Sequence, residues 1–171
     1  MSLKNVVWAV GFAVILSCSC AWAATSTLEA NLDGLQEVPP NGSPAYGFGS
    51  VTLNDVTDMV TVTMGNYNGL LGASAAATIN DAAPGTGGPT ILTLTLDVPG
   101  TTTGTFSGGG MITAGQATDM LAGNTYINIR SSVFPSGEIR GQLFVVPEPA
   151  SLSLIGAATL LTARRKRNTS L

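Results

Sequence analysis

The segment Leu28-Glu29-Ala30-Asn31-Leu32-Asp33 places an apolar residue at every second position and a polar residue between. Because successive side chains of a β-strand point to opposite faces, this alternation predicts one buried face and one wetted face. The same period of two recurs in four further segments of the chain. Their apolar members are Val60, Val62 and Met64; Leu92, Leu94 and Leu96; Ile127 and Ile129; and Ile139, Leu143 and Val145. Strands of this kind are typical of antiparallel sheets that cover a core with one face.

Turn-forming residues separate these segments. They are Pro39-Pro40-Asn41-Gly42, Asn54-Asp55, Asn68-Gly69, Pro84-Gly85, Pro99-Gly100 and Pro135-Ser136-Gly137. About seven or eight short strands at this spacing predict an all-β domain, either an antiparallel immunoglobulin-like sandwich or a Greek-key barrel. A helical pattern is confined to the segment from Ala114 to Leu121, and Gly123-Asn124 ends it.

The composition of residues 24–146, the predicted folded domain, disfavours several classes of function. This segment contains nine carboxylates but only two cations, Arg130 and Arg140, and the whole chain lacks histidine. Both cysteines, Cys18 and Cys20, precede it, so neither a disulfide nor a Ser–His or Cys–His catalytic pair is available. The acidic balance also disfavours nucleic acid as a partner. We therefore expect a domain that is not an enzyme and needs no cofactor.

A carboxylate-dependent enzyme that acts on polysaccharide is the alternative, because glycoside hydrolysis requires only two suitably spaced acids. Asp55 and Asp58 are the nearest pair in sequence, but they flank a predicted turn. Their loop also offers oxygen ligands for calcium, although it lacks the acidic alternation and the glycine of an EF-hand loop. Gly108-Gly109-Gly110 is followed by neither Lys-Ser nor Lys-Thr, so it indicates a bulge or a tight turn and not a phosphate-binding loop.

Residues 1–23 have the three parts of a secretory signal peptide. A short polar start contains Lys4, an apolar stretch of 11 residues runs from Val6 to Leu16, and Ala21-Trp22-Ala23 is a small-x-small cleavage site. We expect signal peptidase to cut after Ala23. A lipoprotein leader is the alternative, because Ile15-Leu16-Ser17 precedes Cys18.

Residues 147–167 also have three parts, in a different order. Pro147-Glu148-Pro149 is stiff and extended, because each proline has a fixed φ and no backbone donor. An apolar run of 12 residues follows, from Leu152 to Ala163, which is shorter than the ~20 residues that normally cross a bilayer. The final part is a cluster of cations that favours the cytoplasmic side of a membrane, formed by Arg164, Arg165, Lys166 and Arg167.

This tail resembles the PEP-CTERM sorting signal of bacteria. The resemblance implies that an exosortase-type membrane enzyme recognises the Pro-Glu-Pro element and removes the tail. It also implies a precursor held in the inner membrane by a transmembrane helix, and a mature form at the cell surface or secreted. Because the PEP-CTERM system is associated with exopolysaccharide, we expect a structural or binding module of the envelope, biofilm matrix or exopolysaccharide. Its possible partners are an extracellular polysaccharide or an envelope protein.

The segment between leader and tail resembles the CHRD domain, a module first described in chordin and also found singly in bacteria. The resemblance covers residues 28 to 145 and depends on several landmarks. They are Leu35-Gln36-Glu37-Val38-Pro39-Pro40, the strand from Gly47 to Leu53, Gly69-Leu70, Ala82-Ala83-Pro84-Gly85 with Gly88-Pro89, the run from Leu121 to Ile129, and the run from Pro135 to Leu143.

The chain departs from this family at three positions. Many members carry a His-x-His pair before the Ala-Pro-Gly turn and another histidine after the Tyr-x-Asn strand, and here those positions are Thr78, Asn80 and Arg130. Two histidines on one face of a strand are able to hold zinc or copper, whereas threonine and asparagine are weak ligands and arginine repels a cation. We therefore expect no metal site. Instead, we expect hydrogen bonds across this face, with Arg130 or Arg140 paired with Glu138 or Asp81.

Overall fold

The computed structural model describes residues 25–147. The predicted leader, with its cleavage residues Ala21 and Ala23, lies outside the described residues. So does the predicted sorting tail beyond Pro147, including Glu148, Pro149 and the basic cluster. The predictions for both ends of the chain therefore stay predictions. Within the described part, no helix is both long enough and apolar enough to cross a membrane.

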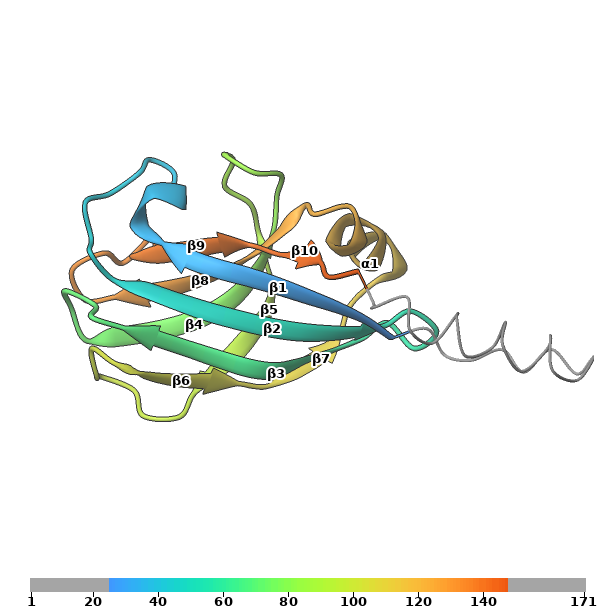
Figure 1. Ribbon diagram of the computed structural model, residues 1–171, viewed down its shortest axis with the longest axis horizontal. Helices are drawn as coiled ribbons and strands as arrows, with labels where there is room; N and C mark the ends of the chain where they lie inside the picture. Colours follow the sequence, from blue (N-terminus) through green and yellow to red (C-terminus); the bar gives the residue numbers. More distant parts are fainter. Residues whose placement is uncertain (1–24, 148–171) are drawn as a thin grey trace, which may run out of the picture.

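The described residues form ten strands and two short helices (Figure 1). In chain order they are β1 (Thr25–Asp33), η1 (Gly34–Gln36), β2 (Tyr46–Asn54), β3 (Met59–Asn68), β4 (Ser74–Asp81), β5 (Thr90–Leu96), β6 (Gly104–Ser107), β7 (Gly109–Met111), α1 (Ala114–Leu121), β8 (Thr125–Ser131), β9 (Ile139–Gln142) and β10 (Phe144–Val145). All strand pairs are antiparallel.

Eight of these strands close into a barrel. Their order is β1-β2-β3-β6-β5-β4-β8-β9, and the pairing of Asp33 with Arg140 joins β9 back to β1. β4, β5 and β6 follow one another as hairpins, and β3, which precedes them, lies beside β6. This arrangement of four strands is a Greek key. The predicted all-β class and the Greek-key barrel are thus confirmed, and the sandwich is not.

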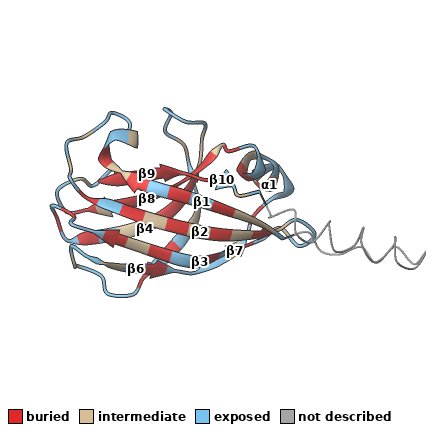
Figure 2. Cartoon of the chain, viewed as in Figure 1, coloured by how far each residue is buried: buried red, intermediate tan, exposed pale blue. Residues whose placement is uncertain are grey.

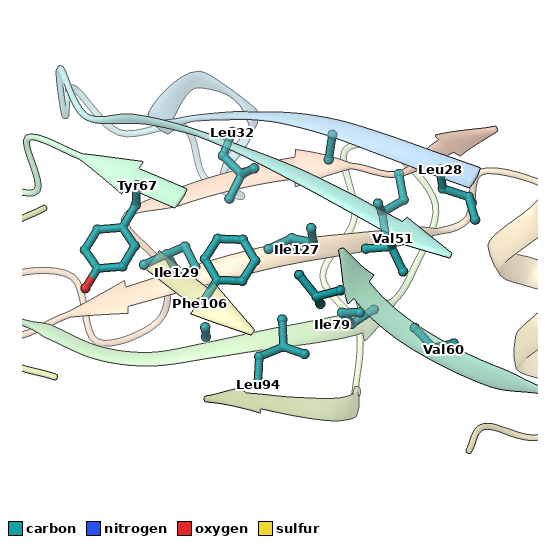
Figure 3. Packing of buried hydrophobic residues seen from close by; sticks show 14 of the residues in the cluster. Leu28, Leu32, Val51, Val60, Tyr67, Ile79, Leu94, Phe106, Ile127 and Ile129 are labelled. Carbon is teal, nitrogen blue, oxygen red and sulfur yellow. The ribbon is translucent and has the colours of Figure 1, made fainter. Parts of the chain in front are cut away.

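The barrel interior is the hydrophobic core. Apolar side chains from every side of the wall meet there, among them Val51, Ile79, Phe106, Ile127 and Ile129 (Figure 3). Buried positions alternate with exposed ones along much of β1 and with half-buried ones along most of β2, as Figure 2 shows. The predicted buried face of the first strand is confirmed, because Leu28, Ala30 and Leu32 are all buried.

Met64, which was predicted to lie in the core, points outward because a bulge interrupts β3. Ser50 pairs with Met64 and Val51 pairs with Val62, so Thr63 is an extra residue between them. One extra residue reverses the facing of the residues after it. As a result, Met64 is 57 % exposed, whereas Val60 and Val62 are buried as predicted.

The other predicted elements agree with the structure except at a few ends. Each of the six turn signals lies at a junction between consecutive strands, and α1 has the predicted bounds. Its start is fixed by a capping box between Thr113 and Gln116, and its buried residues, Ala117 and Met120, belong to the core. Gly108 separates β6 from β7, which both pair with β3. Leu92 is half-buried against the core, whereas Val145 is exposed in the two-residue strand β10.

Candidate functional site

The outer face of β4, β8 and β9 carries polar side chains where most barrel walls meet water. The strand register places Thr78, Asn128 and Arg140 in one row and Asn80, Tyr126 and Gln142 in the next. All six are buried even though they point away from the core. We call this set the outer polar rows. Sequence alternation predicted a wetted face here, and that expectation is wrong.

Loops bury the outer polar rows. The segment after η1 and the segment between β4 and β5 both stand on the side of the barrel formed by β8 and β9 (Figure 1). The loop between β8 and β9 completes the cover, because Asn128 donates a hydrogen bond from Nδ2 to the Ser136 carbonyl at 3.1 Å. A buried polar group needs such partners, since leaving one without a partner costs about 1–3 kcal/mol.

Arg140 lies between the barrel wall and the covering loops and is only 2 % exposed. Its guanidinium stacks on the ring of Tyr126, with 3.4 Å between the guanidinium carbon and the ring centroid. It donates from Nη1 to the Thr86 carbonyl at 2.6 Å and from Nη2 to Gln142 Oε1 at 3.1 Å. Burial lowers the pKa of Arg140 from its ordinary value, while Tyr126 and Glu37 act in the opposite direction. The charged guanidinium therefore fixes the loop between β4 and β5 on the barrel wall.

Thr78 and Asn80 also hold this loop. The Thr78 hydroxyl donates to Asn80 Oδ1 at 2.7 Å, and Asn80 Nδ2 donates to the Gly88 carbonyl at 3.0 Å. The Tyr126 hydroxyl accepts a hydrogen bond from the Gly88 N–H at 3.3 Å. The hydrogen bonds predicted across this face are therefore confirmed at Thr78 and Asn80.

The predicted partners of the arginines need correction. The Glu138 carboxylate accepts instead from the Ser43 hydroxyl at 2.7 Å and from the Leu71 N–H. These contacts join three loops at one end of the barrel. The carboxyl group whose pKa both arginines act to lower is that of Glu37, a residue that sequence reasoning did not select.

Glu37 follows η1 and its side chain is 9 % exposed. Burial raises the pKa of Glu37 from 4.5 to about 7, against the opposing effects of Arg140, the Val38 N–H and Arg130. Desolvation disfavours the ionised form of a carboxyl group, and here it outweighs the attraction to two cations. Glu37 therefore titrates near neutral pH, which is unusual for a glutamate.

Three buried polar atoms near Glu37 have no hydrogen-bond partner among residues 25–147. They are Glu37 Oε1, Asn128 Oδ1 and Arg130 Nε. The backbone of Gly137 lies close to two of them: a Cβ built on Gly137 would come within 2.7 Å of both Glu37 oxygens and of Asn128 Oδ1. Glycine is thus required at 137, because the Glu37 and Asn128 oxygens already occupy the place of a side chain, and its φ of 158° also suits glycine.

Glu37, Asn128 and Arg130 are among the residues that line a pocket of about 160 Å³, which we call the Glu37 pocket. Arg130 and Arg140, the two cations of the described residues, both line it. Two larger grooves, of about 380 and 270 Å³, adjoin it and share Glu37 and Val38 with it. The complete lining of the pocket is Glu37, Val38, Asn80, Gly87, Gly88, Tyr126, Asn128, Arg130, Ser136 and Arg140.

Segments far apart in sequence thus meet at one place. The lining residues come from the segment after η1, strand β4, the loop between β4 and β5, strand β8, and the segment from Ser136 to Arg140. A comparison with models of known protein families matches residues 28–143 to the CHRD domain. The chain belongs to the CHRD domain family. No curated protein and no solved structure matches the chain.

In this CHRD domain, four of the six landmarks of the family resemblance contribute residues to the Glu37 pocket. Glu37 and Val38 belong to the first landmark, Gly88 to the loop landmark, and Ser136 and Arg140 to the last one. The first landmark was therefore the available signal for Glu37. A carboxylate in a family motif that lies on a loop is a better candidate for a site than one on an alternating strand.

The three positions where this CHRD domain lacks the expected histidines lie on adjacent strands. Asn80 and Arg130 line the Glu37 pocket, and Thr78 lies behind them, bonded to Asn80. This set does not fit zinc or copper. Asn80 Oδ1 already accepts a hydrogen bond from the Thr78 hydroxyl, and Arg130 and Arg140 add positive charge at the same pocket. The described residues also hold no group of three or more Asp, Glu, Cys or His side chains arranged for a metal ion.

The nearest pair of carboxylates in the sequence, Asp55 and Asp58, lies in the hairpin between β2 and β3, and neither lines the Glu37 pocket. The Asn54 side chain accepts hydrogen bonds from the Val56 and Thr57 N–H groups and so forms the turn. Asp58 adopts a left-handed conformation, with a φ of 52°. These features give Asp55 and Asp58 a role in the turn.

Proposed function

We propose that this CHRD domain is an exported, non-enzymatic binding module, and that the Glu37 pocket is its binding site. The observation that carries the proposal is the convergence of family landmarks and of both described arginines on one pocket beside the buried Glu37 carboxyl group. A concave site with a few convergent polar groups is typical of a binding site.

Export is proposed from the two ends of the sequence. Residues 1–23 have the parts of a signal peptide, and residues 147–167 have the Pro-Glu-Pro element, apolar run and basic cluster of a PEP-CTERM tail. In this proposal, signal peptidase cuts after Ala23, and an exosortase-type enzyme removes the tail at the inner membrane. The mature form then works at the cell surface or is secreted, as part of the envelope, biofilm matrix or exopolysaccharide.

The export proposal is tested by fractionating native cells and measuring the termini of the protein by mass spectrometry. We expect an extracellular product that begins at Ala24 and lacks Arg164. Replacing Pro147, Glu148 and Pro149 by alanine should leave the precursor in the membrane, whereas the control Thr169→Ala with Ser170→Ala should be released normally. Full-length protein in the soluble interior would overturn the proposal.

One observation favours the alternative of a carboxylate-dependent enzyme acting on polysaccharide. Glu37 is a buried carboxyl group whose pKa is raised to about 7, a value suited to a general acid or base at neutral pH. Glycoside hydrolysis normally needs a second carboxylate across the pocket, however. Glu37 is the one carboxylate that lines the Glu37 pocket. We therefore place binding ahead of catalysis.

The two activities are separated by one pair of measurements on the full chain. The protein is incubated with extracellular polysaccharide from the native cells, and retained polysaccharide and released reducing ends are both quantified. Retention without new reducing ends supports the binding module. Release of reducing ends that disappears in Glu37→Gln supports the enzyme.

A further inference from the structure

The first and the last described residues lie at the same end of the barrel. β1 begins at Thr25, which pairs with Asn54 at the hairpin between β2 and β3. The Val146 N–H donates a hydrogen bond to the Thr27 carbonyl at 2.8 Å, so Pro147 also lies near the start of β1. α1, β7, β10 and this hairpin lie at the same end (Figure 1).

Large apolar side chains are exposed at this end. Met59 on β3 pairs with Met111 on β7, and both point outward. Val56, which is 68 % exposed, lies in the hairpin that leads to Met59. The Phe144 ring lies against Gly123, just after α1. We call the exposed set the terminal apolar face, and its members are Val56, Met59, Met111, Leu121, Phe144 and Val145. Exposed apolar surface of this kind marks contacts with proteins or membranes.

The sequence places an apolar run close to the terminal apolar face. The run starts at Leu152 and ends at Ala163, and four cations follow it. Leu152 is five residues beyond Pro147, a separation that a fully extended chain spans in at most about 18 Å. If the tail holds the precursor in the membrane, as proposed above, then this end of the barrel stays next to the bilayer.

The charges at this end favour a lipid surface without net charge over a second copy of the chain. Asp55 and Asp58 flank Val56 in the hairpin, and Asp119 lies on α1. The two arginines of the described residues both line the Glu37 pocket, so neither offers a cation here. Two copies that met through this end would bring carboxylates together, and an anionic surface would repel the same groups.

We propose that the terminal apolar face docks the folded domain on a zwitterionic phospholipid surface while the tail holds the precursor in the membrane. The inference rests on the export proposed above. Tethering raises the effective concentration of the face at the bilayer, so apolar side chains that bind lipid weakly on their own suffice.

This docking would keep the Glu37 pocket clear of the membrane. Glu37 follows the far end of β1, a strand of nine residues that starts at the terminal apolar face. At about 3.3 Å per residue, the strand separates the two sites by roughly 30 Å along its length. The pocket would therefore be free to bind its ligand before the tail is removed.

The test places the full chain in vesicles of phosphatidylcholine, some of whose acyl chains carry a photoreactive diazirine. Mass spectrometry of fragments locates the label after irradiation. We expect labelling of Val56 and Met111 about tenfold above that of Leu35 and Val133, because only side chains that enter the lipid meet the diazirine. Leu35 and Val133 are matched controls, since both are exposed and apolar but lie beside or in the grooves next to the Glu37 pocket. Equal labelling of the two pairs would overturn the proposal.

Variants assign the contact to the terminal apolar face. Val56→Asn combined with Met111→Thr should lower the labelling of Phe144 about tenfold, because two apolar side chains no longer enter the lipid. The same two replacements at the other end, Leu35→Asn with Val133→Thr, should leave it unchanged. Circular dichroism melting shows whether each variant is folded, and Val56→Asn alone replaces a pair that is not. Unchanged labelling of Phe144 in a folded variant of the face would contradict docking.

The charge of the lipid tests the kind of surface. When anionic phosphatidylglycerol is mixed into the vesicles, the labelling of Val56 and Met111 should fall about threefold at low salt, because carboxylates lie at this end. Roughly 0.5 M sodium chloride should restore it by screening the repulsion. Stronger labelling in the anionic vesicles would overturn the choice of a zwitterionic surface.

The outcomes separate this inference from the proposed function. If the full chain does not float with the vesicles, the membrane-held precursor and the docking are both wrong. If it floats but Val56 and Met111 are labelled no more than Leu35 and Val133, the precursor stands and the docking is wrong. Cross-links from Met111 to Met111 of another copy, without lipid labelling, would show that a second copy covers the face.

Discussion

The two faces of strand β8 are both buried, but they are buried in different ways. Ile127 and Ile129 point into the barrel and are fully covered by other apolar side chains (Figure 3). Tyr126, Asn128 and Arg130 point outward beneath loops, and two of these three side chains carry a polar atom without a partner. At Ile127 and Ile129 the inner face is satisfied by packing alone, whereas the outer face is incomplete at Asn128 and Arg130.

This difference separates stability from function within one strand. Packed apolar groups stabilise the fold in any conditions, but buried polar groups stabilise it only when all of them are paired. Natural proteins keep incomplete polar clusters mainly where a site requires them. Substitutions on the inner face should therefore reduce stability alone, while substitutions on the outer face should separate stability from binding.

The largest expected effect is on the inner face. Ile127→Ala should lower the free energy of unfolding by about 4 kcal/mol, because the side chain is fully buried and packs against Gly49. Urea denaturation measures this loss. Polysaccharide binding by the protein that remains folded should be unchanged, and a loss below about 1 kcal/mol would show that the inner face is not tightly packed.

The second effect is on the outer face, at its most connected residue. Arg140→Met should lower the free energy of unfolding by about 3 kcal/mol, since it removes the hydrogen bonds to Thr86 and Gln142 and leaves the buried Gln142 oxygen without this donor. Arg140→Lys keeps the charge but not the planar fork, so it should lose less. Equal stability of wild type and Arg140→Met would contradict the role of Arg140 in holding the loop.

The sequence was sufficient to predict an antiparallel all-β domain because alternation is a local signal. It left the sandwich and the barrel open, because closure depends on the pairing of β1 with β9. Strands β1 and β8, the turns and α1 lie where the pattern places them. The pattern failed at Met64, because the bulge at Thr63 depends on pairing with β2, a partner that one strand's own sequence does not specify. It also failed on the outer face of β8, because this face is covered by loops that are distant in sequence.

The candidate site was predictable only in part, for the same reason. Resemblance to the CHRD domain selected Thr78, Asn80 and Arg130, and the structure places two of these at the pocket. Glu37 was missed because its importance lies in burial and in its distance from two arginines on other strands. Neither property is visible in the residues around it.

The third expected effect is an increase in the free energy of unfolding, whereas the first two are decreases. Glu37→Gln should raise the free energy of unfolding by roughly 2 kcal/mol above pH 7, because an ionised carboxylate no longer has to be buried. The pKa shift itself corresponds to about 3 kcal/mol, and the amide retains part of the burial cost. The same variant should bind polysaccharide less well, so stability rises as function falls. A loss of stability would show that Glu37 is a structural residue.

The pH dependence of stability provides an independent measurement of the same group. Since the folded-state pKa of Glu37 is raised from 4.5 to about 7, the folded protein holds this proton more tightly than the unfolded chain. The contribution of Glu37 to stability therefore falls as pH rises from 4.5 to about 7, and the loss is complete above that range. The difference between wild type and Glu37→Gln should grow across this interval. Glu29→Gln, which changes an exposed carboxylate, should show no such growth.

The smallest expected effect tests the facing of side chains itself. Met64 is 57 % exposed on the outer side of β3, opposite Ser50, whereas Val62 is buried two residues earlier. Met64→Thr should therefore change the free energy of unfolding by less than about 0.5 kcal/mol, because threonine suits an exposed strand position and little apolar surface is lost. Val62→Thr places a hydroxyl in the core and should cost at least about 1 kcal/mol. Similar losses for both variants in urea denaturation would mean that Met64 and Val62 share a face. In that case β3 would have no bulge, and the inner and outer sides of the barrel would follow the sequence alternation without interruption.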